Sequence, residues 1–449
     1  MPSVMWFRRD LRLHDLPALA EAATAGPVLP LFVLDRGLLD HAGAVRTSCL
    51  YDALRHLHDA CDGRLVVRTG PPERIVPEVA RAVGASSVHV TAESEPYGRH
   101  RDTTVQAALA DAEIDWVATG TPYAIGPGLL HTGGGTPYRV FTPYLRAWRD
   151  HGHPAPAPLP RSLRWADGLD SEPLPPTPDL PADLTLPTCS EDTAHERLTD
   201  FIADDLADYD TLRDRPDLHR TSGLSMHLKF GTIHPRTILA AVAAAGHTPG
   251  TDRFTAELAW REFYADVLWH RPDSLDTDLR PALSTMDYDD PDDTFDAWRT
   301  GHTGFPFVDA GMRQLRTEGW MHNRVRMVTA SFLIKDLHLW WPYGARHFMA
   351  HLRDGDPASN SHGWQWTAGT GTDAAPYFRI FNPITQGQKF DPHGDYVRRY
   401  VPELAHLPGR AVHEPWKHPD GYAHGYPRPI VDHAAERAEA LRRYQAATS

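Results

Sequence analysis

MPSVMWFRRDLRLHDLPALAEAATAGPVLPLFVL, residues Met1–Leu34, decides the fold of the first part of the chain. Two apolar runs, Val4–Phe7 and Val28–Leu34, enclose a helical pattern at Pro17–Thr24. A strand, a helix and a second strand in this order are typical of a parallel sheet with helical connections. The stretch therefore predicts a β-α-β unit.

The same alternation continues to Ala118. Further strand patterns lie at Leu65–Val67, Ser87–Thr91 and Ile114–Ala118, and further helical patterns at Thr47–Asp62, Pro72–Val83 and Tyr97–Asp111. We expect an α/β domain with a doubly wound parallel sheet, which binds ligands at the carboxyl ends of its strands. No GxGxxG follows the first strand and no GxxxxGK[ST] occurs, which argues against a dinucleotide dehydrogenase or a P-loop ATPase.

The rest of the chain has a different texture. Residues His151–Thr188 are rich in proline without a sustained period, which is typical of an extended connector. After Glu191 long helical patterns follow, among them the run Arg313–Trp341, and we expect an all-helical domain reaching to about Leu441. The predicted division is residues 1–130, an α/β domain; 131–190, a connector; and 191–449, a helical domain.

Composition narrows the functional class. The formal net charge is -14, so any site for nucleic acid must be a local basic patch. The three cysteines lack metal or redox spacing and the histidines form no ligand pairs, so we expect buried thiols and no metal site. The chain opens directly on a strand pattern, and no apolar run approaches the length of a membrane span. A cytoplasmic protein is expected.

The segment His351–Pro383, HLRDGDPASNSHGWQWTAGTGTDAAPYFRIFNP, concentrates acids, an Asn, two Trp around one Gln, and an Arg. Such a composition indicates a ligand site, although an aromatic-anchored loop between helices is the plainer alternative. The motifs around this segment decide between the two.

Seven motifs resemble the photolyase/cryptochrome family and fall in order along nearly the whole chain. They are WFRRDLRLHD (6–15), RTSGLS (220–225), ELAWREFY (257–264), TGFPFVDAGMRQL (303–315), GWMHNRVRM (319–327), DGDPASNSHGWQW (354–366) and TGTDAAPYFRIFNP (370–383). The resemblance is closest to class I cyclobutane pyrimidine dimer photolyases. It implies an antenna domain, a connector and a helical domain that binds FAD, and a lyase that repairs UV-damaged DNA with light.

The resemblance implies a set of FAD-binding residues. The hydroxyl-rich stretch before a helix suits a phosphate cradle, although the residues alone fit a plain helix cap equally well. Asn360 is expected to face flavin N5, where plant-type cryptochromes carry Asp. The full set is Tyr209, Thr221, Ser222, Gly223, Leu224, Ser225, Arg261, Asn323, Arg326, Asp354, Asp356, Asn360 and Trp364.

The substrate residues follow from the same resemblance. A dimer flipped out of single- or double-stranded DNA needs flat apolar walls and a few hydrogen bonds. The implied catalytic residues are Glu257, Trp260, Asn323, Met327 and Trp366, and the implied DNA-binding residues are Arg213, Arg324, Arg379 and Lys389. Asn323–Arg324 stands where (6-4) photolyases carry a His pair, so that substrate is not expected. We expect a monomer.

Two further sites are implied. Photoreduction in the family passes along three tryptophans, and Trp364 and Trp341 match the inner two. The outer position is Tyr288, so we expect slow photoreduction or a route through Trp298 or Trp320. Arg46, Glu93, Glu95 and Lys229 match antenna contacts, which favours 8-hydroxy-5-deazaflavin, with methenyltetrahydrofolate or a flavin as alternatives. Salt bridges between domains would explain these four residues equally well.

Two other functions use the same pocket. A cryptochrome photoreceptor would use it for signalling, and a light-independent flavin electron carrier would show no preference for damaged DNA. The chain stops soon after Leu441 without a long signalling tail, which favours repair.

Overall fold

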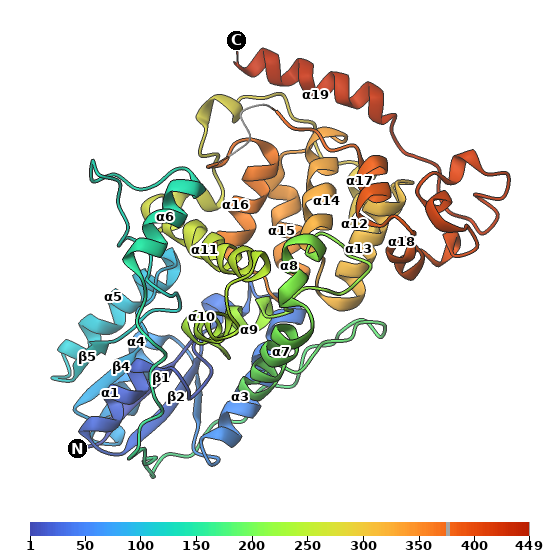
Figure 1. Cartoon of the computed structure of the whole chain (residues 1–449). Helices are drawn as coiled ribbons and strands as arrows, with labels where there is room; N and C mark the ends of the chain where they lie inside the picture. Colours follow the sequence, from blue (N-terminus) through green and yellow to red (C-terminus); the bar gives the residue numbers. More distant parts are fainter. Residues whose placement is uncertain (374–377, 449) are drawn as a thin grey trace. The chain divides into compact units, whose positions relative to one another are not determined.

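The sheet predicted for the first part of the chain is present, with five parallel strands in the order β3-β2-β1-β4-β5 (Figure 1). The computed structural model describes residues 1–373 and 378–448; Ala374–Tyr377 of the TGTDAAPYFRIFNP motif lie outside this range. All residues of β1, β2 and β4 are buried, as expected for strands covered on both faces. The strands are β1 (Ser3–Phe7), β2 (Val28–Leu34), β3 (Val66–Thr69), β4 (Ser87–Val90) and β5 (Asp115–Ala118).

Helices connect these strands. Since the chain moves from β1 through β2 to β3 in one direction and then crosses to β4 and β5, right-handed connections place α1 and α3 on one face and α4 and α5 on the other. The predicted helices are confirmed with shifted ends; α3 begins at Gly43 rather than Thr47. The bounds are α1 (Pro17–Ala25), α2 (Arg36–Leu39), α3 (Gly43–Ala60), α4 (Pro72–Ala82) and α5 (Pro96–Ala110).

The strand order reverses between β1 and β4, where doubly wound sheets usually bind a ligand. In this protein, polar contacts of the loop after β1 occupy the place where such a ligand would bind. One guanidinium nitrogen of Arg8 donates to both carboxylate oxygens of Asp102, at 2.5 and 2.6 Å, and the Thr91 hydroxyl donates to Asp10 at 2.5 Å. The WFRRD motif is therefore used to hold the sheet together, which agrees with the missing dinucleotide fingerprint.

The connector is extended, as predicted, and part of it pairs with the sheet. The Val28 amide donates to the Arg164 carbonyl and the Ala166 amide donates to the Val28 carbonyl, both at 2.8 Å. Trp165, between them, forms a parallel bridge with Val28. The proline-rich segment thus follows the start of β2 rather than hanging free.

The chain folds into two compact units, each made of three segments. The first unit comprises Met1–Asp179, Pro187–Ala207 and Ser222–Pro272, and the second comprises Leu180–Leu186, Asp208–Thr221 and Asp273–Ser449. The first unit contains, besides the sheet, α6 (Phe141–His151), α7 (Glu191–Asp204), α9 (Ser225–Phe230), α10 (Pro235–Ala244) and α11 (Pro249–His270). The predicted helical texture after Glu191 is confirmed, and the division at residues 130 and 190 stays a prediction.

The second unit is helical. The run Arg313–Trp341 is not continuous: Gly319, at φ +60°, caps the end of α13, and His338, at φ +53°, lies between α14 and α15. Its helices are α8 (Tyr209–Leu212), α12 (Asp293–Thr300), α13 (Pro306–Glu318), α14 (Asn323–Lys335), α15 (Trp341–His351), α16 (Pro357–Ala368), α17 (Pro383–Phe390), α18 (Asp395–Tyr400) and α19 (His433–Thr448). Short 3-10 turns lie at Leu206–Asp208, Pro272–Leu275, Pro281–Leu283, Pro402–Leu404, Gly409–His413 and Pro415–Lys417.

Each unit has its own core. Aliphatic side chains such as Val4, Leu31 and Val88 form the core of the sheet. The core of the helical unit is more aromatic and includes Trp298 and Trp341, both completely buried. The helical unit therefore surrounds its tryptophans with other rings and apolar side chains, which positions the site described next.

Candidate functional site

The segment 354–366 places its predicted residues on two faces of α16. Asp356 caps the helix by accepting the Ser359 amide at 2.9 Å, and Asn360 and Trp364 follow at intervals of four residues, on one face. Trp364 is buried, whereas Trp366, two residues on, points elsewhere and is half-buried. The two tryptophans thus serve different surroundings.

Helix α15 packs closely behind that face. The Asn360 amide nitrogen donates to the Ala345 carbonyl at 3.0 Å, which fixes the side chain. A Cβ at Gly344 would lie 2.1 Å from the Trp364 ring, so only glycine lets the two helices approach this far. Asn360 and Trp364 are therefore held rigidly.

Two predicted residues pair beside this face. Arg326 of α14 forms an ion pair with Asp354 at 2.8 Å, and its Nε donates to the Met321 carbonyl at 2.7 Å. The carboxylate of Asp354 is almost completely buried. A charged pair with this burial is a fixed polar contact rather than a surface salt bridge.

The start of α14 carries Asn323 and Met327 four residues apart. The Asn323 amide nitrogen lies 4.0 Å from the Met327 sulfur. His322 caps this helix by accepting the Arg324 amide at 3.2 Å, and burial lowers its pKa to about 4. A neutral imidazole can act as such an acceptor, so the cap persists at neutral pH.

Several aromatic rings surround Trp364. The ring centroids of Trp298 and Trp364 are 6.2 Å apart, and Trp298 is itself completely buried. Trp341 donates to Asp278 at 2.8 Å, and its ring lies 6.4 Å from that of Trp340, which is half-buried. The sequence analysis did not single out Trp340, although its position next to Trp341 in the sequence indicates that the two rings lie close together.

Tyr288, at the predicted outer relay position, packs against the same core. Its hydroxyl is buried and has no hydrogen-bond partner among the described residues. Burial raises the pKa of this phenol above its ordinary value. A buried phenol without an acceptor has no ready route for its proton.

In the first unit, α11 carries Glu257, Trp260 and Arg261. The Trp260 ring stacks on Phe141 of α6 with centroids 3.7 Å apart and an angle of 11° between the planes. Glu257 is half-buried, with its carboxylate 3.3 Å from Arg253. Phe141 is a residue that sequence reasoning missed, because its partner lies far away in the sequence.

Arg261 is engaged in the unit's own structure. Its guanidinium donates to the carbonyls of Pro122 at 3.2 Å and Leu228 at 3.1 Å, and it lies 4.5 Å from the Tyr123 ring centroid. The predicted contact of Arg261 with a cofactor therefore stays a prediction, and this side chain already links the loop at Pro122 to α9.

The next residue, Glu262, was not predicted and is 2% exposed. Its carboxylate accepts from the amides of Ala124, Ile125 and Gly126 and from the Trp148 indole, at 2.5–3.2 Å. Burial raises the pKa of Glu262, and these donors oppose the increase. The side chain joins α11, α6 and the loop at residues 124–126.

The predicted phosphate cradle precedes α9. Gly223 has φ +65°, and a Cβ there would lie 2.4 Å from the Arg197 guanidinium. Arg197 donates to the Ser222 carbonyl at 3.4 Å, and the Ser222 hydroxyl accepts the Leu224 amide at 3.3 Å. Ser225, the first residue of α9, is exposed. Glycine, hydroxyls and an adjacent cation are the groups that an anionic diphosphate requires.

The other two predicted cofactor residues lie in the second unit. Thr221 precedes Ser222 directly in sequence, and Tyr209 is the buried first residue of α8. Arg213 lies 5.9 Å from the Tyr209 ring centroid, and its Nε is 3.7 Å from Asp214.

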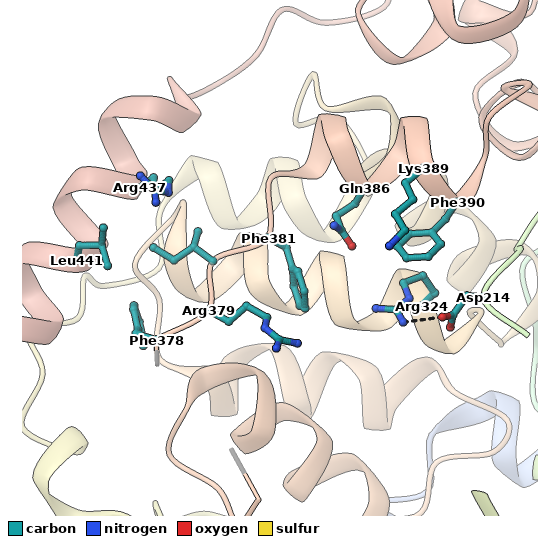
Figure 2. A pocket seen from close by; sticks show the side chains of 11 residues that line it. Asp214, Arg324, Phe378, Arg379, Phe381, Gln386, Lys389, Phe390, Arg437 and Leu441 are labelled. Carbon is teal, nitrogen blue, oxygen red and sulfur yellow. Dashed lines mark hydrogen bonds and ion pairs between the residues drawn. The ribbon is translucent and has the colours of Figure 1, made fainter. Parts of the chain in front are cut away.

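Three of the four predicted DNA-binding cations line one groove of the helical unit, with a volume of about 540 Å³ (Figure 2). Arg324 pairs with Asp214 at 2.8 Å, and Lys389 is exposed. Arg379 is also exposed and lies 6.0 Å from the Trp366 ring centroid. The residues that line the groove are Asp214, Arg324, Phe378, Arg379, Ile380, Phe381, Gln386, Lys389, Phe390, Arg437 and Leu441.

A buried lysine lies behind this groove and was not predicted. The Lys335 ammonium donates to the carbonyls of Thr367, at 2.7 Å, and Arg379, and it lies 4.3 Å from the Phe378 ring centroid. Lys335 is 1% exposed, and burial lowers its pKa to about 7. It connects α14 to the residues that follow Trp366 and flank the groove.

The predicted antenna residues lie in the first unit. Glu93 and Glu95 both pair with Arg9, and although burial opposes it, Arg9, Arg8 and Arg101 lower the pKa of Glu93 to about 2. Arg46 on α3 donates to the His41 carbonyl at 3.2 Å, and Lys229 lies on α9.

A second groove, of about 420 Å³, opens at the ends of β2 and β3. It is lined by Leu34, Arg36, Leu39, Asp40, Gly43, Ala44, Thr47, Tyr51, Thr69, Pro175 and Pro178. Two of these residues, Ala44 and Thr47, flank Arg46 on α3. Arg46 is therefore a sequence neighbour of residues that line this groove and is not itself in the lining.

No helix in 1–373 or 378–448 is both long and apolar enough to cross a membrane. In the same ranges, no three His, Cys, Asp or Glu side chains gather as metal ligands. Cys49, Cys61 and Cys189 are all buried, as predicted.

Comparison with known proteins agrees with the geometry. Residues 3–161 match a family described as DNA photolyase, and residues 254–446 match the FAD binding domain of DNA photolyase. The deoxyribodipyrimidine photo-lyase of Streptomyces griseus is 42% identical over 97% of both chains. The crystal structure of a class III photolyase from Agrobacterium tumefaciens covers 100% of this chain and 98% of its own, with a TM-score of 0.93 and 38% identity. A Synechocystis cryptochrome is similar at 28% identity and a TM-score of 0.91, covering 98% and 99%. The predicted family is confirmed, and the chain belongs to the DNA photolyase family, whose members include DNA-repair enzymes.

Proposed function

We propose that this protein uses light to split cyclobutane pyrimidine dimers in DNA, with FAD as its electron donor. The observation that carries the proposal is the groove of the helical unit, where Arg324, Arg379 and Lys389 meet, with Trp366 beside Arg379. Cations that hold a DNA backbone next to an aromatic wall for a base are the parts that a flipped lesion requires.

The residues of this chain fit FAD. The turn at Ser222–Ser225, with Gly223 and the adjacent Arg197, suits the diphosphate. The face of Asp356, Asn360 and Trp364 suits the flavin ring, and Thr221, Tyr209, Asn323, Arg326, Asp354 and Arg261 complete the proposed set. When bound, FAD supplies the light-excited electron.

Asn360 keeps the flavin environment neutral. Its amide nitrogen is committed to Ala345, which leaves the side-chain oxygen as an acceptor suited to a protonated ring nitrogen. A carboxylate at this position would add a negative charge. The rigid packing of α15 against α16 prevents the amide from turning away.

The residues proposed to hold the lesion are those that the family resemblance implies. Trp366 and Trp260 are the proposed walls, each contributing about 1–3 kcal/mol by stacking, and Met327 is a further wall. Because Phe141 covers one face of Trp260, the opposite face is the one suited to a pyrimidine. Glu257 and Asn323 are proposed to hydrogen-bond the carbonyls of the dimer.

The reaction has no net redox change. One electron enters the dimer, the two carbon–carbon bonds between the pyrimidines break in turn, and the same electron returns to its donor. The protein's part is to hold the reacting groups, to exclude water and to stabilise negative charge on the pyrimidine carbonyls.

The electron relay needed for activation is proposed to avoid Tyr288. The buried phenol has no acceptor for its proton among the described residues. Trp298, with its ring 6.2 Å from that of Trp364, supports the alternative route; Trp341 remains the other inner member. Trp320 is a second possible route.

An antenna chromophore is proposed for the first unit. The groove beside Arg46 at the ends of β2 and β3 supports a planar ligand there, and 8-hydroxy-5-deazaflavin is our first choice, before methenyltetrahydrofolate or a flavin. Glu93, Glu95 and Lys229 are kept as proposed contacts. We also propose that the protein is a cytoplasmic monomer and that its domains divide at residues 130 and 190.

The alternative is a cryptochrome photoreceptor, which the similarity to the Synechocystis cryptochrome favours. The test is to mix purified protein carrying FAD with single-stranded DNA containing dimers, in blue light and in the dark. We expect intact pyrimidines only after light, and a large loss of yield in Trp366→Ala. Binding without splitting would favour the photoreceptor, and equal affinity for undamaged DNA would favour a flavin electron carrier.

A further inference from the structure

The C-terminal helix α19 is fixed to the helical unit along its length. One ion pair, two histidine–carboxylate hydrogen bonds and one ring contact hold it: Arg443 with Asp289 at 2.8 Å, His433 with Asp336 at 2.5 Å, His338 with Glu436 at 2.8 Å, and the Tyr444 ring stacked on that of Phe378 with centroids 4.4 Å apart. Ala440, a residue of α19 itself, is buried. A helix with this many attachments presents its remaining side chains in fixed positions.

Arg437 is the exception among the charged side chains of α19. It is exposed, and its guanidinium has no ion pair or hydrogen bond to any residue in 1–373 or 378–448. By contrast, Arg442 and Arg443 both pair with Glu439. A cation left unpaired on a firmly held helix is available to an external anion.

Arg437 lines the same groove as the proposed DNA-binding cations. Four cations line the groove, Arg324, Arg379, Lys389 and Arg437, together with one carboxylate among the described lining residues, Asp214, which is already paired with Arg324. In a chain with a net charge of -14, such a concentration of positive charge is local. In Figure 2, Arg379 lies between Arg437 and the Arg324–Asp214 pair. The cations therefore extend along the groove in one direction.

We propose that Arg437 binds a backbone phosphate of the lesion-bearing DNA strand, so that α19 forms one end of the DNA interface. The proposal rests on the proposed function, because it takes the groove as the path of the DNA. The planar guanidinium suits phosphate oxygens, and a contact at this end supplies affinity without touching the reacting bases.

The test is the salt dependence of DNA binding in the dark, measured by fluorescence anisotropy with dimer-containing single-stranded DNA. Each phosphate neutralised contributes roughly 0.7 to the slope of log K against log salt for single strands. Arg437→Gln is expected to reduce the slope by about this amount and to weaken binding several-fold at low salt. Arg442→Gln, on the same helix but paired with Glu439, is the matched control and should leave the slope unchanged.

A second experiment varies the position of the dimer within the oligonucleotide. Two oligonucleotides with the dimer near the 5′ end or near the 3′ end extend to opposite sides of the lesion. Only the one whose long arm reaches α19 should lose affinity in Arg437→Gln, whereas a loss with both, or with neither, would overturn the proposal. FAD content and circular dichroism matching the wild type exclude misfolding.

The outcomes separate the two proposals. If the wild type prefers dimer-containing DNA and the slope is the same in Arg437→Gln, the proposed phosphate contact is wrong and the proposed function stands. If the wild type shows no preference for the dimer, the proposed function is wrong, and the slope with undamaged DNA still decides whether Arg437 binds phosphate. The yield of splitting per bound dimer should be equal in both proteins, because Arg437 lies outside the lesion site.

Discussion

Lys335 offers a direct test of the packing behind the groove. Replacing it by Met keeps a long apolar side chain but removes the ammonium that donates to the carbonyls of Thr367 and Arg379. Burial lowers the pKa of this lysine from 10.5 to about 7. At about 1.4 kcal/mol per pKa unit, the folded protein disfavours the charged form by roughly 5 kcal/mol relative to the unfolded chain.

The sign of the pH dependence follows from this shift. Below pH 7 both states carry the charge, and the folded state bears the whole cost. As the pH rises from about 7 toward 10.5, the folded protein loses a proton that the unfolded chain keeps, so the unfolded state binds more protons and folding becomes more favourable. The stability of the wild type relative to Lys335→Met should therefore rise by about 2 kcal/mol between roughly pH 7 and 9.

The small number of lysines makes the assay simple. The chain has only Lys229, Lys335, Lys389 and Lys417, so protein labelled with ¹³C at lysine Cε gives four signals that single substitutions assign. The signal lost in Lys335→Met should shift with pH around neutrality. Lys417, 61% exposed and paired with Glu414, serves as the surface reference, and Lys417→Met as the matched stability control.

Two results would refute the reasoning. A Lys335 signal that does not move between about pH 6 and 8.5 would mean that the ammonium stays charged in place. A stability difference between wild type and Lys335→Met that is constant over the same range would lead to the same conclusion. In either case the carbonyls of Thr367 and Arg379 would compensate for burial fully.

Three further predictions concern single side chains. Phe141→Ala removes the ring stacked on Trp260 and should weaken dimer binding by about 0.5–1.5 kcal/mol, seen as a higher Kd with unchanged FAD content; Phe141→Tyr should restore it. Glu262→Gln places an amide N–H donor opposite the N–H groups of residues 124–126 and should lower the free energy of unfolding by about 1–3 kcal/mol, measured by thermal unfolding. Glu257→Gln, on the same helix, should leave stability unchanged and lower the repair yield. Photoreduction with an external thiol, followed by transient absorption of tryptophan radicals, should be unchanged in Tyr288→Phe and slow in Trp298→Phe; a loss confined to Tyr288→Phe would contradict rerouting.

The sequence predicted what depends on local pattern. Every strand of the sheet was located, with ends that moved by only a few residues. The fully buried strands β1, β2 and β4 are nearly continuous apolar runs, as parallel strands covered on both faces usually are. The separation of Trp364 from Trp366 was also predictable, because residues two apart on a helix point in different directions. The grouping of Arg324, Arg379 and Lys389 came from family resemblance, and the groove agrees with it.

What the sequence did not predict depends on distant partners. Glu262 looks like any helical glutamate until the fold brings residues 124–126 and Trp148 to it. Lys335 stands among apolar residues of α14, but its carbonyl partners lie far along the chain. The sequence alone does not distinguish Arg437 from Arg442 or Arg443. The three differ in their ion pairs, since Arg442 and Arg443 pair with Glu439.

The interleaving of the two compact units has a consequence for synthesis on the ribosome. The sheet unit is completed only by the segment Ser222–Pro272, long after its strands have been made. Until α11 emerges, the amides of residues 124–126 lack the carboxylate of Glu262, so a nascent chain that ends within the connector exposes them to water. Translation that stalls or terminates early should therefore yield fragments that proteases remove, and splitting the gene near codon 190 should not yield two independently stable halves.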